Sequence, residues 1–175
     1  MFPNKAMFAA ALAVSYMFLG GSAQAADSNL NNWQIVAPQG SGFSILMPGN
    51  PTPQTYSSKY NGADLLSHVY NLAAPDGSED FMAGYADYPT NVNAASILEG
   101  NRKSEIGAGH VLFEQNTTLN GHPGKRIAVT DGKRAWVSEF YVAGNRGYAA
   151  RYTTRNLLRA ALDAAPFLGS LQIAQ

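Results

Sequence analysis

The chain of 175 residues contains no cysteine, so disulfide bonds, thiolate nucleophiles and cysteine-based metal sites are all excluded. It has three histidines, and no two of them stand at the spacing of a metal-binding pair such as His-x-His or His-Glu-x-x-His. The Gly-x-Ser-x-Gly sequence that marks the nucleophile turn of many hydrolases is also missing. Stability must therefore come from packing alone, and few residues are candidates for catalysis.

The sequence also lacks an apolar run long enough for a membrane-spanning helix, which needs about 20 residues. The apolar run at residues 6–19 follows Lys5 and precedes Ala23-Gln24-Ala25, which has the Ala-x-Ala pattern of a signal-peptidase site. We predict a signal peptide at residues 1–25, cleavage before Ala26, and export to the periplasm or out of the cell. An uncleaved membrane anchor is the alternative. We expect no transmembrane segment in the mature chain.

Charge of one sign is not in excess, because 12 basic residues balance 12 acidic ones. An exported chain without net charge is a poor candidate for nucleic-acid binding. The charges are nevertheless uneven along the chain, since most of the basic residues follow Gly121 and most of the acidic ones precede it. Either a basic surface faces a charged partner, or the two halves interleave in space and the charges mix.

Turn signals are frequent and indicate antiparallel strands. Asn-Gly and Asp-Gly favour two-residue hairpin turns, because both central residues of such a turn need a positive φ. The turns are expected at Asn61-Gly62, Asn120-Gly121, Asp131-Gly132 and Gly144-Asn145. The last three predict a meander over residues 112–154. Earlier strands are expected at residues 33–37, 43–47, 55–60, 63–72 and 81–88.

Both faces of the predicted meander are apolar. A two-residue loop at Asp131-Gly132 would place Ile127 opposite Trp136, and the side chains then sort into two sets. One face collects Ile127, Val129, Trp136, Phe140 and Val142, and the other collects Ala128, Val137, Tyr141, Tyr148 and Tyr152. In a sheet with one solvent-exposed face, apolar and polar residues would alternate along each strand. Because they do not alternate here, we expect other elements to cover both faces.

Two helices are expected. The first spans residues 93–107, with Asn93 as its cap and an exit at Gly107. The second runs from Thr154 to Pro166, and its apolar residues recur at helical spacing. They are Leu157, Leu158, Ala161, Leu162 and Ala165. A short apolar tail at residues 167–173 should dock on the core.

Four stretches together resemble a known superfamily. They are GFSILMPGNP at 42–51, LNGHPGKRIAV at 119–129, FYVAGNRGYAARYTT at 140–154 and APFLGSLQI at 165–173. In this order they resemble small bacterial exported domains of the PsbP-like superfamily, the fold of photosystem II protein PsbP and of a Ran-binding nuclear import factor. The resemblance implies an α+β fold, in which a single antiparallel sheet is flanked by helices as an α/β/α sandwich. It also implies one domain over residues 26–175, with a binding or assembly role rather than an enzymatic one.

Two groups of residues are candidates for binding. Five tyrosines of the first half could line a groove for a small ligand or peptide; they are Tyr56, Tyr60, Tyr70, Tyr85 and Tyr88. Arg151, Arg155 and Arg159 are four apart and would form a stripe for an acidic partner if the last helix began one turn early. Otherwise Arg151 belongs to the preceding strand, and the other two only keep the helix soluble.

Catalytic and metal-binding constellations are weaker. Ser67 and His68 are neighbours on a strand and point to opposite faces, so they cannot act as nucleophile and base. The acidic turn that begins at Asp76 lacks the glycine and the glutamate that a calcium loop requires later in the loop. We therefore predict no catalytic residues, no metal site and no cofactor.

The sequence leads to three hypotheses about function. The first is an exported, non-enzymatic binding or assembly-accessory protein of the cell envelope, whose partner is another envelope protein. The second is a module that binds a small ligand or a metal ion. An exported hydrolase is the least favoured, since its reactive residues do not come together in the pattern.

Overall fold

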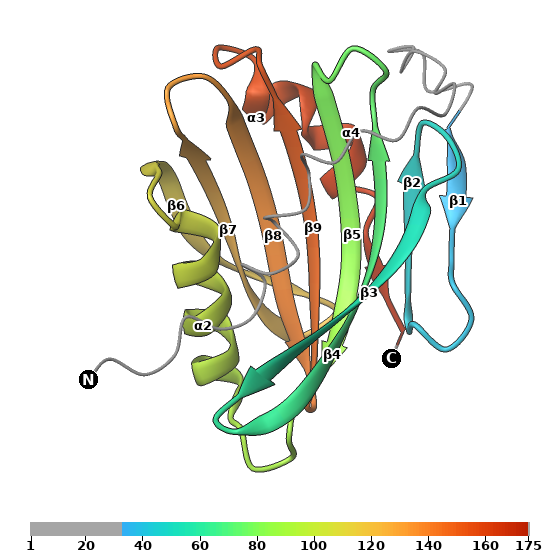
Figure 1. The fold of residues 1–175 in the computed structure, drawn as a ribbon, viewed down its shortest axis with the longest axis vertical. Helices are drawn as coiled ribbons and strands as arrows, with labels where there is room; N and C mark the ends of the chain where they lie inside the picture. Colours follow the sequence, from blue (N-terminus) through green and yellow to red (C-terminus); the bar gives the residue numbers. More distant parts are fainter. Residues whose placement is uncertain (1–32, 175) are drawn as a thin grey trace.

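The computed structural model describes residues 33–174 (Figure 1). The predicted signal peptide at residues 1–25 lies outside the described residues. In chain order the elements are β1 (Gln34–Val36), β2 (Phe43–Met47), β3 (Thr52–Tyr60), β4 (Ala63–Ala73), β5 (Glu79–Asp87), α2 (Ala94–Ile106), β6 (His110–Leu119), β7 (His122–Thr130), β8 (Ala135–Ala143), β9 (Arg146–Thr154), α3 (Ala160–Asp163), α4 (Ala165–Leu168) and β10 (Gln172–Ile173).

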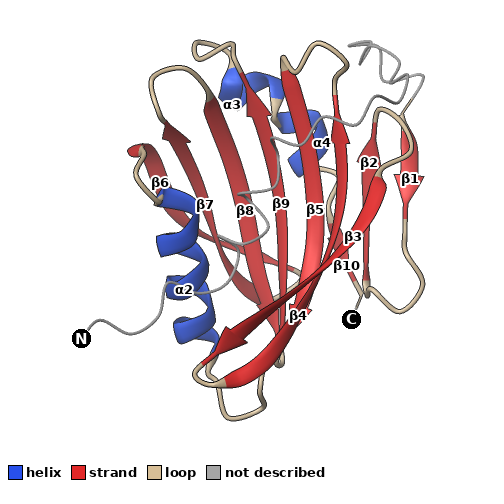
Figure 2. Ribbon diagram, in the orientation of Figure 1, coloured by secondary structure: helices blue, strands red, loops and turns tan. Residues whose placement is uncertain are grey.

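The described strands form two antiparallel sheets (Figure 2). The larger sheet has the order β3-β4-β5-β9-β8-β7-β6, and the smaller has the order β1-β2-β10. The expected α+β fold is confirmed, but the expectation of a single sheet is wrong. A turn at residues 48–51 with two prolines follows β2, and both edges of β2 pair with β1 and β10. β2 therefore has no free edge with which to join the larger sheet.

One face of the larger sheet packs against α2, which lies in front of β6, β7 and β8 in Figure 1. As expected, Asn93 caps this helix, and its side chain accepts a hydrogen bond from the Ser96 N–H at 2.8 Å. Ile97 is fully buried on the inner side of α2, in one cluster with Leu65 of β4 and Val142 of β8. The inward side of α2 is thus held by apolar contacts around Ile97 and by two buried polar residues, Asn101 and Glu105.

The opposite face of the larger sheet packs against the smaller sheet, α3 and α4. Phe81 of β5 and Tyr152 of β9 lie 5.2 Å apart between ring centroids, and Phe167 of α4 meets Phe81 edge-on at 5.3 Å. Three buried residues of β2 belong to the same cluster; they are Phe43, Ile45 and Met47. A largely aromatic core therefore joins α4 and the smaller sheet to the larger one.

The meander is present, and its two faces are sorted as the sequence predicts. The predicted register across β7 and β8 is wrong, because Ile127 pairs with Ser138 and Val129 pairs with Trp136. The loop between the two strands covers residues 131–134 instead of the expected two residues, because Thr130 pairs with Ala135. The Asp131 carboxylate stabilises this longer loop by accepting hydrogen bonds from the N–H groups of Lys133 and Arg134, both at 2.8 Å. A shift of two residues leaves every side chain on its predicted face.

The last helix differs most from its prediction. It is divided into α3 and α4, and Pro166 stands at the start of α4 rather than at the end of a longer helix. The buried residues are Ala160, Ala164, Phe167 and Leu168, whereas the five residues of the predicted apolar face are exposed. The alanines are small, so α3 can lie close to an inner layer that aromatic rings already fill. The predicted docking of the C-terminal tail is confirmed, because Leu171 and Ile173 are buried.

Candidate functional site

The five candidate tyrosines do not lie together. Tyr60 and Tyr88 meet edge-on at 5.4 Å on the α2 side of the sheet, and Tyr56 packs with the cluster of Val69 and Met82. The other two, Tyr70 and Tyr85, both surround Phe43 on the opposite side.

The five tyrosines therefore do not share one surface, and a groove lined by some of them stays a prediction. Tyr88 is also fixed from within, because its hydroxyl donates to Asn101 Oδ1 at 3.1 Å and burial raises its pKa above the ordinary value. Binding by any one of these residues stays a prediction.

The three candidate arginines are divided as well. Arg151 lies within β9, where it is opposite Ser138 of β8 and Met82 of β5, so it does not continue a helical stripe. Arg155 and Arg159 are exposed in the segment that leads into α3. Arg159 forms an ion pair with Asp163 at 3.3 Å. Only two of the three arginines can therefore share one surface.

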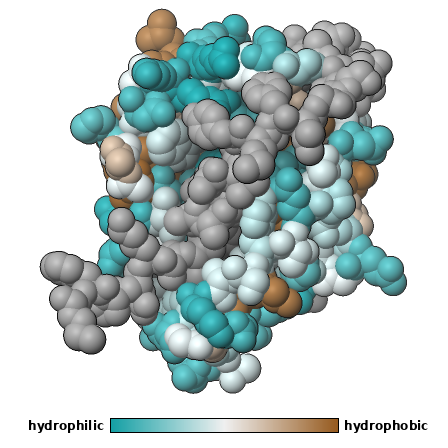
Figure 3. All heavy atoms as spheres, in the orientation of Figure 1, coloured by the Kyte–Doolittle hydropathy of each residue, from teal (hydrophilic) through white to brown (hydrophobic). Residues whose placement is uncertain are grey.

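Three leucines stand out from the surface beside these two arginines. Leu157, Leu158 and Leu162 are 39%, 97% and 70% exposed. Figure 3 shows apolar side chains protruding at the top of the molecule, where α3 lies in Figure 1. We call this surface the α3 shoulder, and it consists of Arg155, Leu157, Leu158, Arg159 and Leu162. The sequence pattern marks the same leucines but assigns them to the core.

A row of charged groups lies on the α2 side of the sheet. Ser138 donates to Glu105 Oε2 at 2.5 Å, and Arg134 donates to Asp80 Oδ2 at 2.5 Å. Burial lowers the pKa of Arg151, and the negative charges of Glu105 and Asp80 oppose that shift. Two acids and two arginines balance one another, and this row contains no histidine. It has the composition of a structural network rather than that of a nucleophile with its base.

The histidines are far from one another in the fold. His68 stacks on Tyr85 at 4.8 Å and lies 3.2 Å from the Thr55 hydroxyl through its Nδ1. Ser67, its neighbour on the strand, is buried. Among residues 33–174 no three acidic or histidine side chains are grouped to hold a metal ion. Within the same residues, no helix has both the length and the apolar character of a membrane span.

Comparison with known proteins adds a fold but no activity. No protein-family model matches the chain, and no curated protein matches it. The solution structure of cyanobacterial PsbP (CyanoP) from Synechocystis sp. PCC 6803 is similar, with a TM-score of 0.53 and 11% sequence identity, over 90% of this chain and 98% of that chain. The chain has a PsbP-like fold. The resemblance predicted from four sequence stretches is thereby confirmed at the level of the fold.

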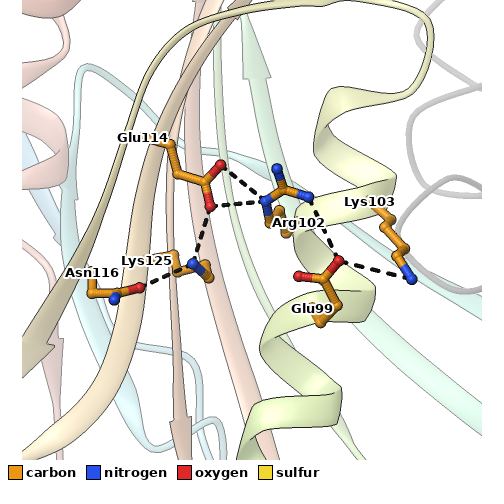
Figure 4. Close-up of polar contacts among 6 residues, drawn as sticks. All are labelled: Glu99, Arg102, Lys103, Glu114, Asn116 and Lys125. Carbon is orange, nitrogen blue, oxygen red and sulfur yellow. Dashed lines mark hydrogen bonds and ion pairs between the residues drawn. The ribbon is translucent and has the colours of Figure 1, made fainter.

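In this PsbP-like fold, an ionic network fastens α2 to the edge strand β6 (Figure 4). Glu114 of β6 accepts hydrogen bonds from Arg102 Nε at 2.8 and 2.9 Å and from Lys125 Nζ at 3.0 Å. Lys125 also donates to Asn116 Oδ1 at 2.9 Å, and Glu99 reaches Arg102 at 3.5 Å. The hydrogen bond from Arg102, with help from Lys125, holds the pKa of Glu114 below its ordinary value.

Glu114→Gln should lower the free energy of unfolding by about 1 kcal/mol at neutral pH, because Arg102 and Lys125 lose their charged acceptor. The folded-state pKa of Glu114 lies below the ordinary 4.5. The stabilisation is thus complete above pH 4.5 and disappears as the pH falls through the folded-state pKa. Urea unfolding at several pH values measures the difference.

Glu99→Gln is the matched control, since Glu99 belongs to the same network but its side chain is 46% exposed. We expect an effect below about 0.5 kcal/mol at every pH. A Glu114→Gln defect that persisted unchanged in acid would contradict the assigned role of the carboxylate charge.

Proposed function

We propose that this chain is an exported, non-enzymatic binding or assembly-accessory protein of the cell envelope, and that the α3 shoulder contacts its protein partner. One observation carries the proposal: three leucines face solvent beside two exposed arginines, on a segment whose other side is docked on the core. The PsbP-like fold and the Ala-x-Ala sequence before Ala26 support it.

The shoulder has the chemistry of a protein interface. Exposed apolar residues that cluster on a surface and have a charged rim are typical of binding sites. Leu158 is 97% exposed, so a partner that covered it would gain nearly the whole side chain as new buried surface. Arg155 and Arg159 would sit at the rim, where positive charge favours an acidic partner surface.

Photo-crosslinking in the cell of origin tests the proposal. The full chain is expressed with benzoylphenylalanine in place of Leu158, or in place of Lys133 as an exposed control in the β7–β8 turn. We expect one dominant protein adduct from position 158 and none from position 133. The mature protein recovered from the envelope fraction should begin at Ala26.

Replacing both Leu158 and Leu162 by serine should weaken the captured complex about tenfold or more, because two apolar anchors are lost. Arg155→Gln with Arg159→Gln should weaken it less, since rim charges mainly affect the association rate. Binding is measured by titration against the partner identified by crosslinking. Adducts with lipid alone would contradict the proposed role of the α3 shoulder. A complex that is not weakened when Leu158 and Leu162 are both replaced by serine would also contradict it.

A further inference from the structure

The larger sheet ends in two edge strands, β3 and β6. β6 begins at the left margin of the sheet in Figure 2, and its far end approaches the smaller sheet, because Asn120 in the following turn donates to the Ile173 carbonyl oxygen of β10 at 3.0 Å. It joins β7 by a two-residue turn, in which Asn120 and Gly121 have φ angles of 51° and 83°, and Leu119 pairs with His122. The closing pair of such a turn exchanges both backbone hydrogen bonds. Alternate residues of β6 therefore direct their backbone groups away from β7; they are Glu114, Asn116 and Thr118.

The other edge, β3, is protected against pairing with a further strand. Its turn to β4 has the same form, with Asn61 at φ 50° and Gly62 at φ 87°, and Tyr60 pairs with Ala63. The outward positions are therefore Pro53, Thr55, Ser57 and Lys59. Proline offers no donor, and a lysine at an edge opposes pairing with another chain.

β6 is less protected, because its one irregularity is a register shift between Val111 and Phe113, at the start of the strand. It contains no proline, lysine or arginine, and its one carboxylate, Glu114, is held by Arg102 and Lys125. Its first half exposes apolar side chains, since Val111, Leu112 and Phe113 are 42%, 57% and 39% exposed. Figure 3 shows apolar side chains at the left margin, where β6 begins in Figure 1. An open edge of this kind favours pairing with another strand.

We propose that β6 pairs antiparallel with β6 of a second copy of this chain, on a two-fold axis at Gln115. This inference goes beyond the proposed function and uses a different surface from the α3 shoulder. The axis places Glu114 opposite Asn116 of the second copy, and Phe113 opposite Thr117. Lys125 occupies Asn116 Oδ1, which leaves the amide N–H groups of Asn116 to donate to the facing carboxylate.

The proposed register follows from symmetry and charge. Residues that face each other across a two-fold antiparallel pair lie on the same face of the sheet, so the axis must pass through a residue position. An axis at Glu114 would set two carboxylates against each other. With the axis at Gln115, Glu114 of each copy faces Asn116 of the other copy. Phe113 of each copy likewise faces Thr117 of the other, which is a favourable pair of an aromatic and a β-branched side chain. Because β3 is protected, the pairing closes as a dimer and does not extend into a filament.

Asn116→Pro tests the pairing and keeps the backbone ladder between β6 and β7, because this position has its N–H directed away from β7; within the chain it removes only the hydrogen bond from Lys125 to Asn116 Oδ1. Ser57→Pro is the matched control, at an outward position of the protected edge. By sedimentation equilibrium we expect a dimer for the unaltered protein and for Ser57→Pro. Asn116→Pro removes the backbone donor and the side-chain amide donor of each copy, so four hydrogen bonds per dimer are lost, and it should raise the dissociation constant about 30-fold or more.

Since the chain has no cysteine, a single Gln115→Cys substitution reports the axis directly. Two such residues would face each other as a non-hydrogen-bonded pair, about 4.5 Å apart between Cα atoms, and should oxidise to a disulfide-linked dimer. Ser57→Cys should not. A monomer at concentrations from about 1 to about 100 µM would overturn the proposal. So would a dimer unaffected by Asn116→Pro, or crosslinking of position 115 to a different protein.

These outcomes are independent of the α3 shoulder. Asn116→Pro should leave the adduct at position 158 unchanged, and the two leucine substitutions should leave the dimer unchanged. Loss of one property without the other therefore identifies which of the two proposals has failed.

Discussion

Replacing Phe167 by alanine should lower the free energy of unfolding by about 3–5 kcal/mol. The side chain is fully buried and meets Phe81 edge-on at 5.3 Å, in the cluster that joins α4 and β2 to the larger sheet. Its removal loses the transfer free energy of a phenyl ring and leaves a cavity that neither sheet can fill, because both are fixed by their ladders. Urea unfolding of the two purified proteins measures the change.

Leu158→Ala is the matched control, because Leu158 is 97% exposed although helical spacing would bury it. Its effect should stay within about 0.5 kcal/mol. Equal losses for the two variants would mean that the segment from Leu157 to Leu168 is turned the other way, as the sequence pattern alone predicts.

Gly84→Ala should destabilise the protein by about 1–3 kcal/mol or more, through overpacking between β4 and β5. A Cβ atom at Gly84 would lie 2.5 Å from the His68 carbonyl oxygen and 3.2 Å from Val69 Cα. Both are backbone atoms of the neighbouring strand, so no side-chain rotation relieves the contact. The two strands must separate locally, in a region where Val69 and Ala83 are fully buried.

Gly100→Ala provides a control of opposite sign. Gly100 lies within α2, and a Cβ atom there would meet nothing within 4 Å. Alanine should therefore stabilise the helix by up to about 1 kcal/mol. Both variants can be compared by thermal and urea unfolding, and a Gly84→Ala protein as stable as the unaltered one would contradict the close approach of β4 and β5.

The local parts of this fold are readable from the sequence because their causes are local. Asn120 and Gly121 adopt the positive φ angles that a two-residue hairpin turn requires. Asn93 caps α2 with its own side chain. The apolar faces of the meander are also correct although the register at β7 and β8 is not. The error arises because Asp131 binds two backbone N–H groups of its own turn, and hairpin length depends on such contacts.

The parts that sequence reasoning missed depend on distant partners. β2 reads as a strand from its own residues, but its pairing with β10 joins Phe43 to Ile173. Likewise, helical spacing cannot tell that Ala160 and Ala164, rather than Leu158 and Leu162, meet the aromatic core. For the same reason the α3 shoulder could not be predicted, because helical spacing assigns its exposed leucines to the core.

The place of β2 between β1 and β10 also sets an order of events during folding. Most of the larger sheet pairs neighbours in the chain, so its hairpins can form as soon as their own residues are free to pair. The smaller sheet cannot close until the last strand has been made, because residues 172–173 complete it. Until then the aromatic face around Phe81 stays uncovered. A chain that ends before Ala160 would keep that face bare, and incomplete copies should therefore aggregate or be degraded where complete ones fold.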